Sequence, residues 1–223
     1  MSPLNLKKAP RKRGRPKVEG LPERRREEIL AVATEEFARR GYPGTDLQAV
    51  ADRLGVGKGT VYRYFETKEA LFLAAADRSM RLLKDECERA AAAGSDAFER
   101  IVLATRAYLR FYDRGPEFIE IMIQERAEFR DRKRHTYFLH HEANIGPWND
   151  LFRELIARGE IRKIPPERIT DIINDVLYGA IFTNYFDSRR RSPDRQADEI
   201  LDVIFRGILG PGVRRPMKKG ATS

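Results

Sequence analysis

Residues 45–65 hold two short apolar stripes separated by a glycine-containing turn, and this spacing constrains the fold more than any other feature of the chain. The first stripe recurs at helical spacing and comprises Leu47, Val50, Ala51 and Leu54. Only Gly55, Val56 and Gly57 precede a second helical segment that carries Val61 and Phe65 on one face. Because two helices joined by so short a turn must cross at a steep angle, the sequence predicts a helix-turn-helix.

The residues around this motif predict where its helices begin and end. Thr45 and Gln48 form a capping-box pattern, in which the hydroxyl accepts a backbone N–H while the glutamine reaches back. A preceding helix is expected to open at Pro22 and to end at Gly41, the positions that proline and glycine favour. Thr67 is expected to cap the long helix that follows.

Helical spacing of apolar residues continues through the rest of the chain and predicts an all-α protein of about nine helices. After residue 67 the expected helices are 67–94, 95–115, 117–130, 137–158, 166–187 and 194–209. We expect four regions: a basic disordered arm at 1–20, a helix-turn-helix domain at 21–70, a helical ligand-binding and dimerisation domain at 71–209, and a basic disordered tail at 210–223.

The charge of the chain is concentrated at its two ends. The net charge is +9, yet residues 1–20 hold seven Lys and Arg against one acid, and residues 210–223 hold four basic residues and no acid. Residues 21–209 together are almost neutral. A basic arm on a neutral body favours a nucleic-acid partner over general coating of polyanions.

Other classes of protein are disfavoured. One cysteine, Cys87, allows no intrachain disulfide, and the apolar run at 176–182 is too short to span a bilayer. No catalytic triad, phosphate loop or paired carboxylates stand out, so we expect no enzyme and no cofactor. The three histidines, His135, His140 and His141, lack the spacing that places two ligands on one helix face, so no metal site is expected. The expected location is the cytoplasm, without a membrane partner.

The second helix of the predicted motif has side chains suited to a DNA major groove. Lys58 supplies a charge for phosphate or guanine, Gly59 permits close approach of the backbone, and Thr60 suits a base edge. Tyr62 and Tyr64 carry hydroxyl groups that can reach phosphate oxygens. An ordinary surface helix with two aromatic residues is the alternative.

The stretch from Gly44 to Leu71, with Phe37 and Gly41 before it, closely resembles the DNA-binding domain of the TetR/AcrR family of bacterial transcription regulators. The resemblance implies a homodimer that reads a palindromic operator, and a divergent body that binds a small ligand and dimerises through its last two long helices. Carried over by position, the implied DNA-facing residues are Thr45, Gln48, Lys58, Gly59, Thr60, Tyr62, Tyr64 and Lys68. One departure from the family pattern is Gly57, where serine usually caps the recognition helix; glycine is tolerated there.

Two later segments have apolar faces broader than a single neighbour inside one monomer requires. They lie at 166–187 and 194–209, and we expect them to form a four-helix dimer interface. A purely intramolecular core is the alternative. Large side chains gather at 108–152 and could line a pocket for a small apolar or aromatic effector, although each could equally be core. The predicted ligand-binding residues are Phe111, Met122, Trp148, Phe152 and Tyr178.

These observations predict a ligand-responsive repressor that binds double-stranded DNA. The alternatives are an architectural protein of AT-rich DNA with little sequence selectivity and a transcriptional activator of the same fold. Within the arm, Arg13-Gly14-Arg15-Pro16 resembles the core of the AT-hook, which places arginine in the narrow minor groove. We therefore expect Arg13 and Arg15 to contact DNA beside the operator; a tail that only increases solubility is the alternative.

Overall fold

The computed structural model describes residues 21–187 and 191–206, and all regular secondary structure in these ranges is helical. Arg13, Arg15 and the two basic terminal segments lie outside the described residues. The ten described helices are α1 (Leu21–Gly44), α2 (Leu47–Arg53), α3 (Lys58–Tyr64), α4 (Lys68–Ala91), α5 (Ala97–Arg114), α6 (Pro116–Glu128), α7 (Thr136–Asn144), α8 (Gly146–Ala157), α9 (Pro166–Asp187) and α10 (Pro193–Arg206). The all-α fold is confirmed, and the expected number of helices was close.

The expected single helix at 137–158 is in fact two helices, α7 and α8. Pro147 lies in the first turn of α8, where its missing N–H is harmless. Within one continuous helix the same proline would remove a hydrogen bond and clash with the preceding turn. The chain therefore bends at Ile145 and Gly146, and this bend allows the two short helices to cover one side of the body.

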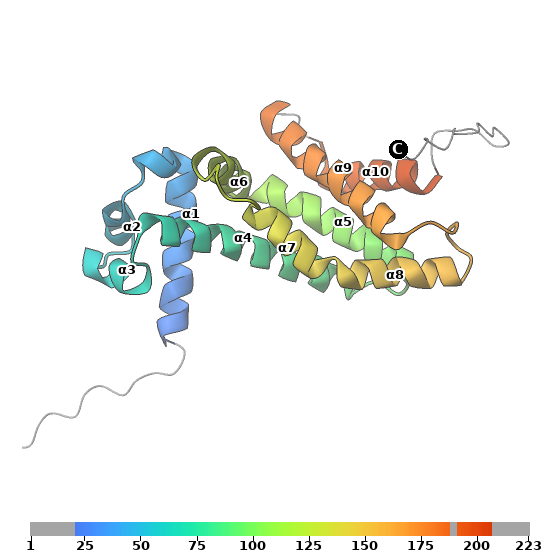
Figure 1. Cartoon of the computed structure of the whole chain (residues 1–223), viewed down its shortest axis with the longest axis horizontal. Helices are drawn as coiled ribbons and strands as arrows, with labels where there is room; N and C mark the ends of the chain where they lie inside the picture. Colours follow the sequence, from blue (N-terminus) through green and yellow to red (C-terminus); the bar gives the residue numbers. More distant parts are fainter. Residues whose placement is uncertain (1–20, 188–190, 207–223) are drawn as a thin grey trace, which may run out of the picture.

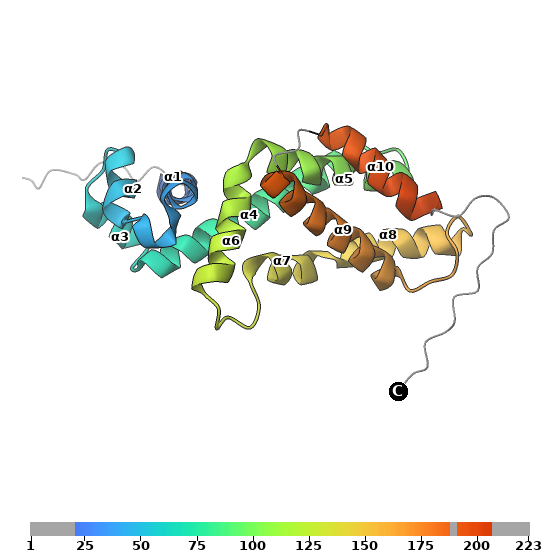
Figure 2. The ribbon, with the colours of Figure 1, turned by 90° about the horizontal axis from the view of Figure 1, so that it is seen from above.

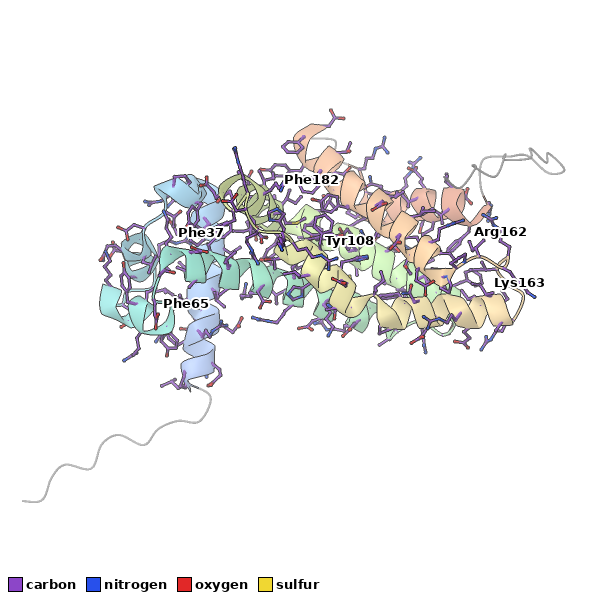
Figure 3. The ribbon with its side chains drawn as sticks, viewed as in Figure 1. Phe37, Phe65, Tyr108, Arg162, Lys163 and Phe182 are labelled. Atoms are coloured by element: carbon purple, nitrogen blue, oxygen red, sulfur yellow. The ribbon has the colours of Figure 1, made fainter. Side chains whose placement is uncertain are left out.

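Helices α1–α3, which we call the head, pack around a core shared with the beginning of α4. Phe37, Val50, Val61 and Phe72 are fully buried there, and Figure 3 shows Phe37 and Phe65 inside this cluster. Helix α1 is kinked at Gly41, whose backbone has φ 73° and ψ 162°. This region of backbone space is accessible essentially only to glycine.

Helix α4 extends from the head into the remaining helices, α5–α10, which we call the body (Figures 1 and 2). Its first turns contribute Leu71 and Phe72 to the core of the head. Its later turns contribute Met80 and Leu83 to the core of the body. With 24 residues, α4 is about 36 Å long. One continuous helix thus belongs to both cores.

Helix α6 makes a second connection between body and head. Its Gln124 is buried and donates its Nε2–H to the carbonyl oxygen of Phe37, with an N···O distance of 2.9 Å. The ring of Phe129, just after α6, packs on Tyr42 and Phe72 at centroid distances of 5.1 and 5.4 Å. The kinked end of α1 is therefore held by both α4 and α6. No helix in the described ranges is long and apolar enough to cross a membrane.

Candidate DNA-binding surface and effector pocket

The second helix of the helix-turn-helix, α3, has one buried face and one exposed face. Val61 is fully buried, while Lys58, Gly59, Tyr62 and Arg63 are exposed. Gly57 occupies the N-cap position in extended conformation. Because glycine has no side chain, α3 begins without a side-chain cap hydrogen bond. The exposed face of α3 therefore presents two cations, an aromatic ring and a glycine to solvent at the end of the molecule farthest from the body (Figure 1).

Arg63 lies near the centre of this exposed face, although it was not among the predicted DNA-facing residues. Residues two apart on a helix point about 160° away from one another, so Arg63 faces almost directly opposite Val61. Its guanidinium lies 5.7 Å from the ring centre of Tyr64 and has no ion pair among the described residues. Its exposure could have been predicted from its position two residues after Val61, which was expected to be buried.

Other predicted DNA-facing residues lie around this surface. The Lys58 ammonium lies 3.7 Å from a carboxylate oxygen of Asp46 and 5.6 Å from the ring centre of Tyr62. Gln48 donates its side-chain amide to Asp52 at 2.6 Å. Thr60 and Tyr64 are half-buried beside the exposed face. For these residues DNA contact stays a prediction.

Two members of the predicted set, Thr45 and Lys68, make hydrogen bonds within the chain. Thr45 is only 2% exposed, and its hydroxyl bonds the carbonyl oxygens of Glu36 at 3.1 Å and Gly41 at 2.8 Å. The cap of α2 is Asp46, whose carboxylate accepts the Gln48 N–H at 2.9 Å. The prediction that Thr45 caps α2 was wrong by one residue, because its hydroxyl bonds carbonyl oxygens at the kink of α1; DNA contact by Thr45 stays a prediction.

Lys68 bonds the backbone at the end of α1. Its ammonium donates to the carbonyl oxygens of Tyr42, Pro43 and Thr45 at 2.7, 3.2 and 3.0 Å. It also lies 4.5 Å from the ring centre of Tyr42. All three donors of the ammonium therefore join the start of α4 to the end of α1, and DNA contact by Lys68 stays a prediction.

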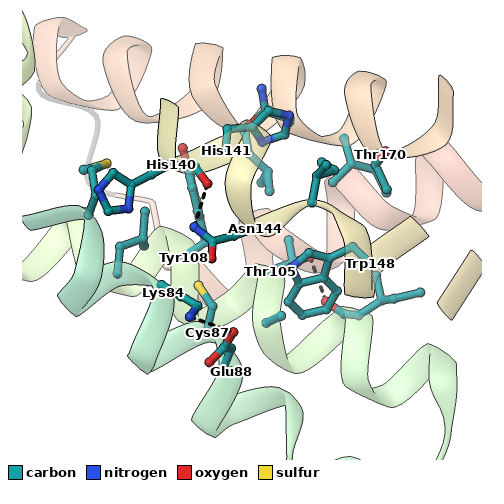
Figure 4. A pocket seen from close by; sticks show the side chains of 18 of the residues that line it. Lys84, Cys87, Glu88, Thr105, Tyr108, His140, His141, Asn144, Trp148 and Thr170 are labelled. Atoms are coloured by element: carbon teal, nitrogen blue, oxygen red, sulfur yellow. Dashed lines mark hydrogen bonds and ion pairs between the residues drawn. The ribbon is translucent and has the colours of Figure 1, made fainter. Parts of the chain in front are cut away.

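The body encloses a cavity of about 190 Å³, which we call the apolar pocket (Figure 4). Helices α4, α5, α7, α8 and α9 all contribute to its wall, so segments far apart in the sequence meet there. Most of the lining is apolar and includes Leu83, Ile101, Ala104, Ile173 and Leu177. Of the predicted ligand-binding residues, Trp148 and Phe152 line this cavity.

A chain of polar groups crosses one side of the apolar pocket. The hydroxyls of Tyr108 and Tyr137 lie 3.0 Å apart, and Tyr137 donates to Oδ1 of Asn174 at 2.7 Å. Burial raises the pKa of Tyr108 well above its ordinary value, so the hydroxyl stays protonated. Burial also lowers the pKa of His141, which favours a neutral ring. The wall thus offers uncharged hydrogen-bonding groups inside an apolar cavity.

The other three predicted ligand-binding residues belong to the core around the pocket. Phe111 stacks on Phe118 at a centroid distance of 4.5 Å, and the sulfur of Met122 accepts the Tyr112 hydroxyl at 3.5 Å. Tyr178 packs between Tyr137 and Phe182. Tyr108 and Tyr137 belong to the large side chains at 108–152 that were expected to line a pocket, although they were not among the five selected residues, and Asn174 was missed. Asn174 follows two isoleucines on α9, and Asp171 and Asp175 flank it, so no local pattern set it apart from the other polar residues of that helix.

The three histidines do not gather. His140 Nε2 lies 2.8 Å from a carboxylate oxygen of Asp77, and His135 Nε2 lies 3.0 Å from Arg126. Within the described ranges no three metal-ligating side chains come together. Cys87 lines the apolar pocket, and burial raises its pKa to about 12, which disfavours the thiolate form.

Helices α9 and α10 expose apolar side chains on the outside of the body. Ile172, Val176 and Phe186 share one face of α9, and Val203 is exposed on α10. Other residues of these helices, including Leu177, Ile181 and Leu201, are buried in the body. The two helices therefore have apolar residues on both an inner and an outer face.

Comparison with known proteins agrees with this architecture. Residues 29–75 match the bacterial regulatory proteins of the tetR family. The HTH-type transcriptional repressor KstR of Mycobacterium tuberculosis is 28% identical over 189 residues, which cover 83% of this chain and 81% of that protein.

Solved structures share the whole fold. The regulator FadR of Bacillus subtilis, solved in complex with stearoyl-CoA, has a TM-score of 0.71 at 18% identity, covering 82% of this chain and 99% of that one. A TetR/AcrR-family regulator of Thermobifida fusca has a TM-score of 0.61 at 26% identity, covering 86% and 100%. The matched helix-turn-helix and the relatives together support a DNA-binding transcriptional regulator, whose residues 29–75 are similar to the DNA-binding domain of the tetR family.

Proposed function

We propose that the chain is a ligand-responsive repressor that binds a palindromic operator as a homodimer and is released by an effector in the apolar pocket. The observation that carries this proposal is α4, which contributes Leu71 and Phe72 to the head and Leu83 and Cys87 to the pocket wall. A ligand in the pocket would therefore contact α4, the helix whose first turns belong to the core of the head. The effector acts through its different affinity for two positions of that helix.

The exposed face of α3 supports DNA as the partner. Two heads related by a two-fold axis meet successive major grooves when they are about 34–36 Å apart. We propose Lys58, Tyr62 and Arg63 as the main contacts, with Gly59 permitting close approach. The test is an electrophoretic mobility assay on a palindrome selected from random DNA, with competitor DNA and a salt series. A specific regulator prefers the palindrome by about 10³-fold or more, and an architectural protein shows almost no preference.

The exposed face of α9 and α10 supports the homodimer. In the single chain, α9 exposes three apolar residues to solvent: Ile172, Val176 and Phe186. In a four-helix interface between two protomers, such residues would be buried against the partner. Val176→Glu should give a monomer in sedimentation velocity. Leu139→Glu is the matched control, because Leu139 on α7 is 41% exposed against 40% for Val176. A monomeric wild-type protein at micromolar concentration would overturn the dimer.

The apolar wall supports a small apolar effector. FadR, which shares the fold, was solved with stearoyl-CoA, and KstR is named a repressor; we carry both features over as proposals. Release of the operator on addition of an acyl compound, measured by fluorescence anisotropy of labelled DNA, tests them together. A compound that binds and tightens the complex would instead support the activator of the same fold. The expected place of action is the cytoplasm, where the DNA is.

The N-terminal arm is an accessory DNA contact in this proposal. Arg26 lies 5.2 Å from the ring centre of Phe65, so the chain enters α1 beside the end of α3. From there Arg13 and Arg15 could follow the duplex into an AT-rich minor groove. Deletion of residues 1–18 should weaken operator binding and flatten its salt dependence. Unchanged affinity and slope would leave the arm as a solubilising tail.

A further inference from the structure

Three polar side chains in the lining of the apolar pocket form a hydrogen-bonded group, which we call the polar trio: Tyr108, Tyr137 and Asn174. They come from α5, α7 and α9. The Tyr137 hydroxyl donates to Oδ1 of Asn174 at 2.7 Å and lies 3.0 Å from the Tyr108 hydroxyl. Because the single proton of Tyr137 goes to Asn174, Tyr108 is the donor of the second bond. Both phenol protons are therefore used inside the trio.

The amide of Asn174 keeps donors that the polar trio does not use. Its N–H groups have no hydrogen-bond partner among the residues that the structure describes. This surplus does not depend on which way the amide is turned. Each phenol has one donor and the amide has two, so in either orientation the bonds inside the trio leave at least one amide N–H unused. A donor that faces an apolar cavity without a partner is costly, and an acceptor atom on a ligand would remove that cost.

The basic residues of the pocket lining leave no free positive charge for an acid. They are Lys84, His140 and His141. The Lys84 ammonium lies 3.6 Å from Glu88, a pair that Figure 4 draws as a dashed line, and His140 Nε2 lies 2.8 Å from Asp77. Burial lowers the pKa of His141, which favours its neutral ring. A carboxylate ligand would therefore lose its water without gaining an unpaired cation, and this is costly.

We propose that the effector is a compact uncharged molecule whose carbonyl, or a similar neutral acceptor oxygen, bonds the amide of Asn174 inside the apolar pocket. This inference rests on the proposed function, because it names the chemistry of the effector. The cavity of about 190 Å³ is smaller than the ~300–1,000 Å³ common for drug-sized ligands, which sets the compact size. Asn174 determines specificity in this arrangement: its N–H favours an acceptor oxygen, and the apolar wall around it excludes charge.

Three benzene derivatives of similar size test the two parts of the inference. Acetophenone has a neutral acceptor oxygen, ethylbenzene has a methylene group in its place, and benzoate has a charge. Acetophenone is better hydrated than ethylbenzene, so it should bind as tightly or more tightly only if the protein replaces its hydrogen bond to water. Benzoate should bind at least about tenfold more weakly than acetophenone. Isothermal titration calorimetry without DNA measures all three.

Asn174→Asp isolates the donor. At pH 8.5, where the new carboxylate is ionised, it still accepts the Tyr137 hydroxyl but has no N–H group to offer. The ratio of the affinities for acetophenone and ethylbenzene should fall about tenfold. Because the readout is a ratio, a general loss of packing does not move it. Asn184→Asp is the matched control, because Asn184 is also on α9 but bonds Gln196 and does not line the pocket.

Ala104→Leu shows where the probes bind, because Ala104 lines the pocket and the added carbons fill part of it. Acetophenone and ethylbenzene should both lose affinity in this variant, and melts followed by circular dichroism check that all variants are folded. Benzoate that binds wild-type protein as tightly as acetophenone overturns the inference, as does a ratio that Asn174→Asp leaves unchanged or binding that Ala104→Leu does not weaken. Failure of the proposed function is seen separately, as acetophenone that binds with the expected selectivity while the operator complex persists.

Discussion

The head and the body are both helical, yet they differ in how tightly they are packed and in where their function lies. In the core of the head, which the start of α4 shares, Ile29, Phe37, Val50 and Phe72 are completely buried, and the chemistry for DNA lies outside on α3. The body surrounds a cavity with side chains from five helices. A surface that must fit a duplex needs a rigid support, whereas a surface that must admit a ligand needs space.

The largest expected effect tests this difference in packing. Phe72→Ala should destabilise the protein by about 3–5 kcal/mol, because it removes a fully buried ring that contacts Phe37, Tyr42 and Phe129. Trp148→Ala should cost clearly less, because one side of its ring already faces a hollow. Urea unfolding followed by circular dichroism measures both. Equal losses would mean that the wall of the pocket is as tightly packed as the head.

The second prediction concerns the outside of the head. Arg63→Gln should reduce specific operator binding by about 1–3 kcal/mol, the value of one bidentate contact to guanine. Stability should be unchanged, since Arg63 has no ion pair among the described residues. Arg153→Gln, an exposed arginine on α8, is the control. An unchanged affinity for the operator would remove Arg63 from the DNA-binding surface.

The third prediction tests whether head and body are joined through α6. Gln124→Met keeps the shape of the side chain but leaves the Phe37 carbonyl oxygen without its partner, at a cost of about 1–3 kcal/mol. The effector should then bind as before but release the operator less completely. Ile123→Met, on the same helix, is the control. Unaltered release in Gln124→Met would leave α4 as the main route between the two regions.

The smallest effect is a dependence on pH within the body. Burial lowers the pKa of His141 below its ordinary value of 6.5, so the unfolded chain takes up a proton before the folded chain does. The stability contributed by the neutral ring is complete above pH 6.5 and is lost as the pH falls below it. His141→Gln should flatten this decline in melts between pH 7.5 and 5. An identical slope in both proteins would contradict a titrating His141.

The sequence predicted the head well because its signals are local. The stripe of Leu47, Val50 and Ala51 and the turn after it fixed the helix-turn-helix within 20 residues. The error at Thr45 arose because its hydroxyl and the cap at Asp46 lie one residue apart, and only the kink of α1 decides between them.

The pocket could be predicted only in part. Trp148 and Phe152 were predicted because large residues gather near them in the sequence. The same reasoning selected Phe111 and Met122, which belong to the core instead. Tyr137 meets Asn174 across 37 residues of chain. Such contacts depend on how α7 and α9 cross, and no spacing within a single helix encodes that crossing.

The kink at Gly41 has a consequence for how this chain can evolve. Near it, three side chains from different elements bond backbone carbonyl oxygens: Thr45 bonds Gly41, Lys68 bonds Tyr42, and Gln124 bonds Phe37. Any other residue at position 41 would have to adopt a backbone conformation that side chains disfavour. A lineage that lost this glycine would shift the end of α1 and, with it, the carbonyl oxygens near the kink that these side chains bond. We therefore expect these four positions to change together among descendants of this protein, or not at all.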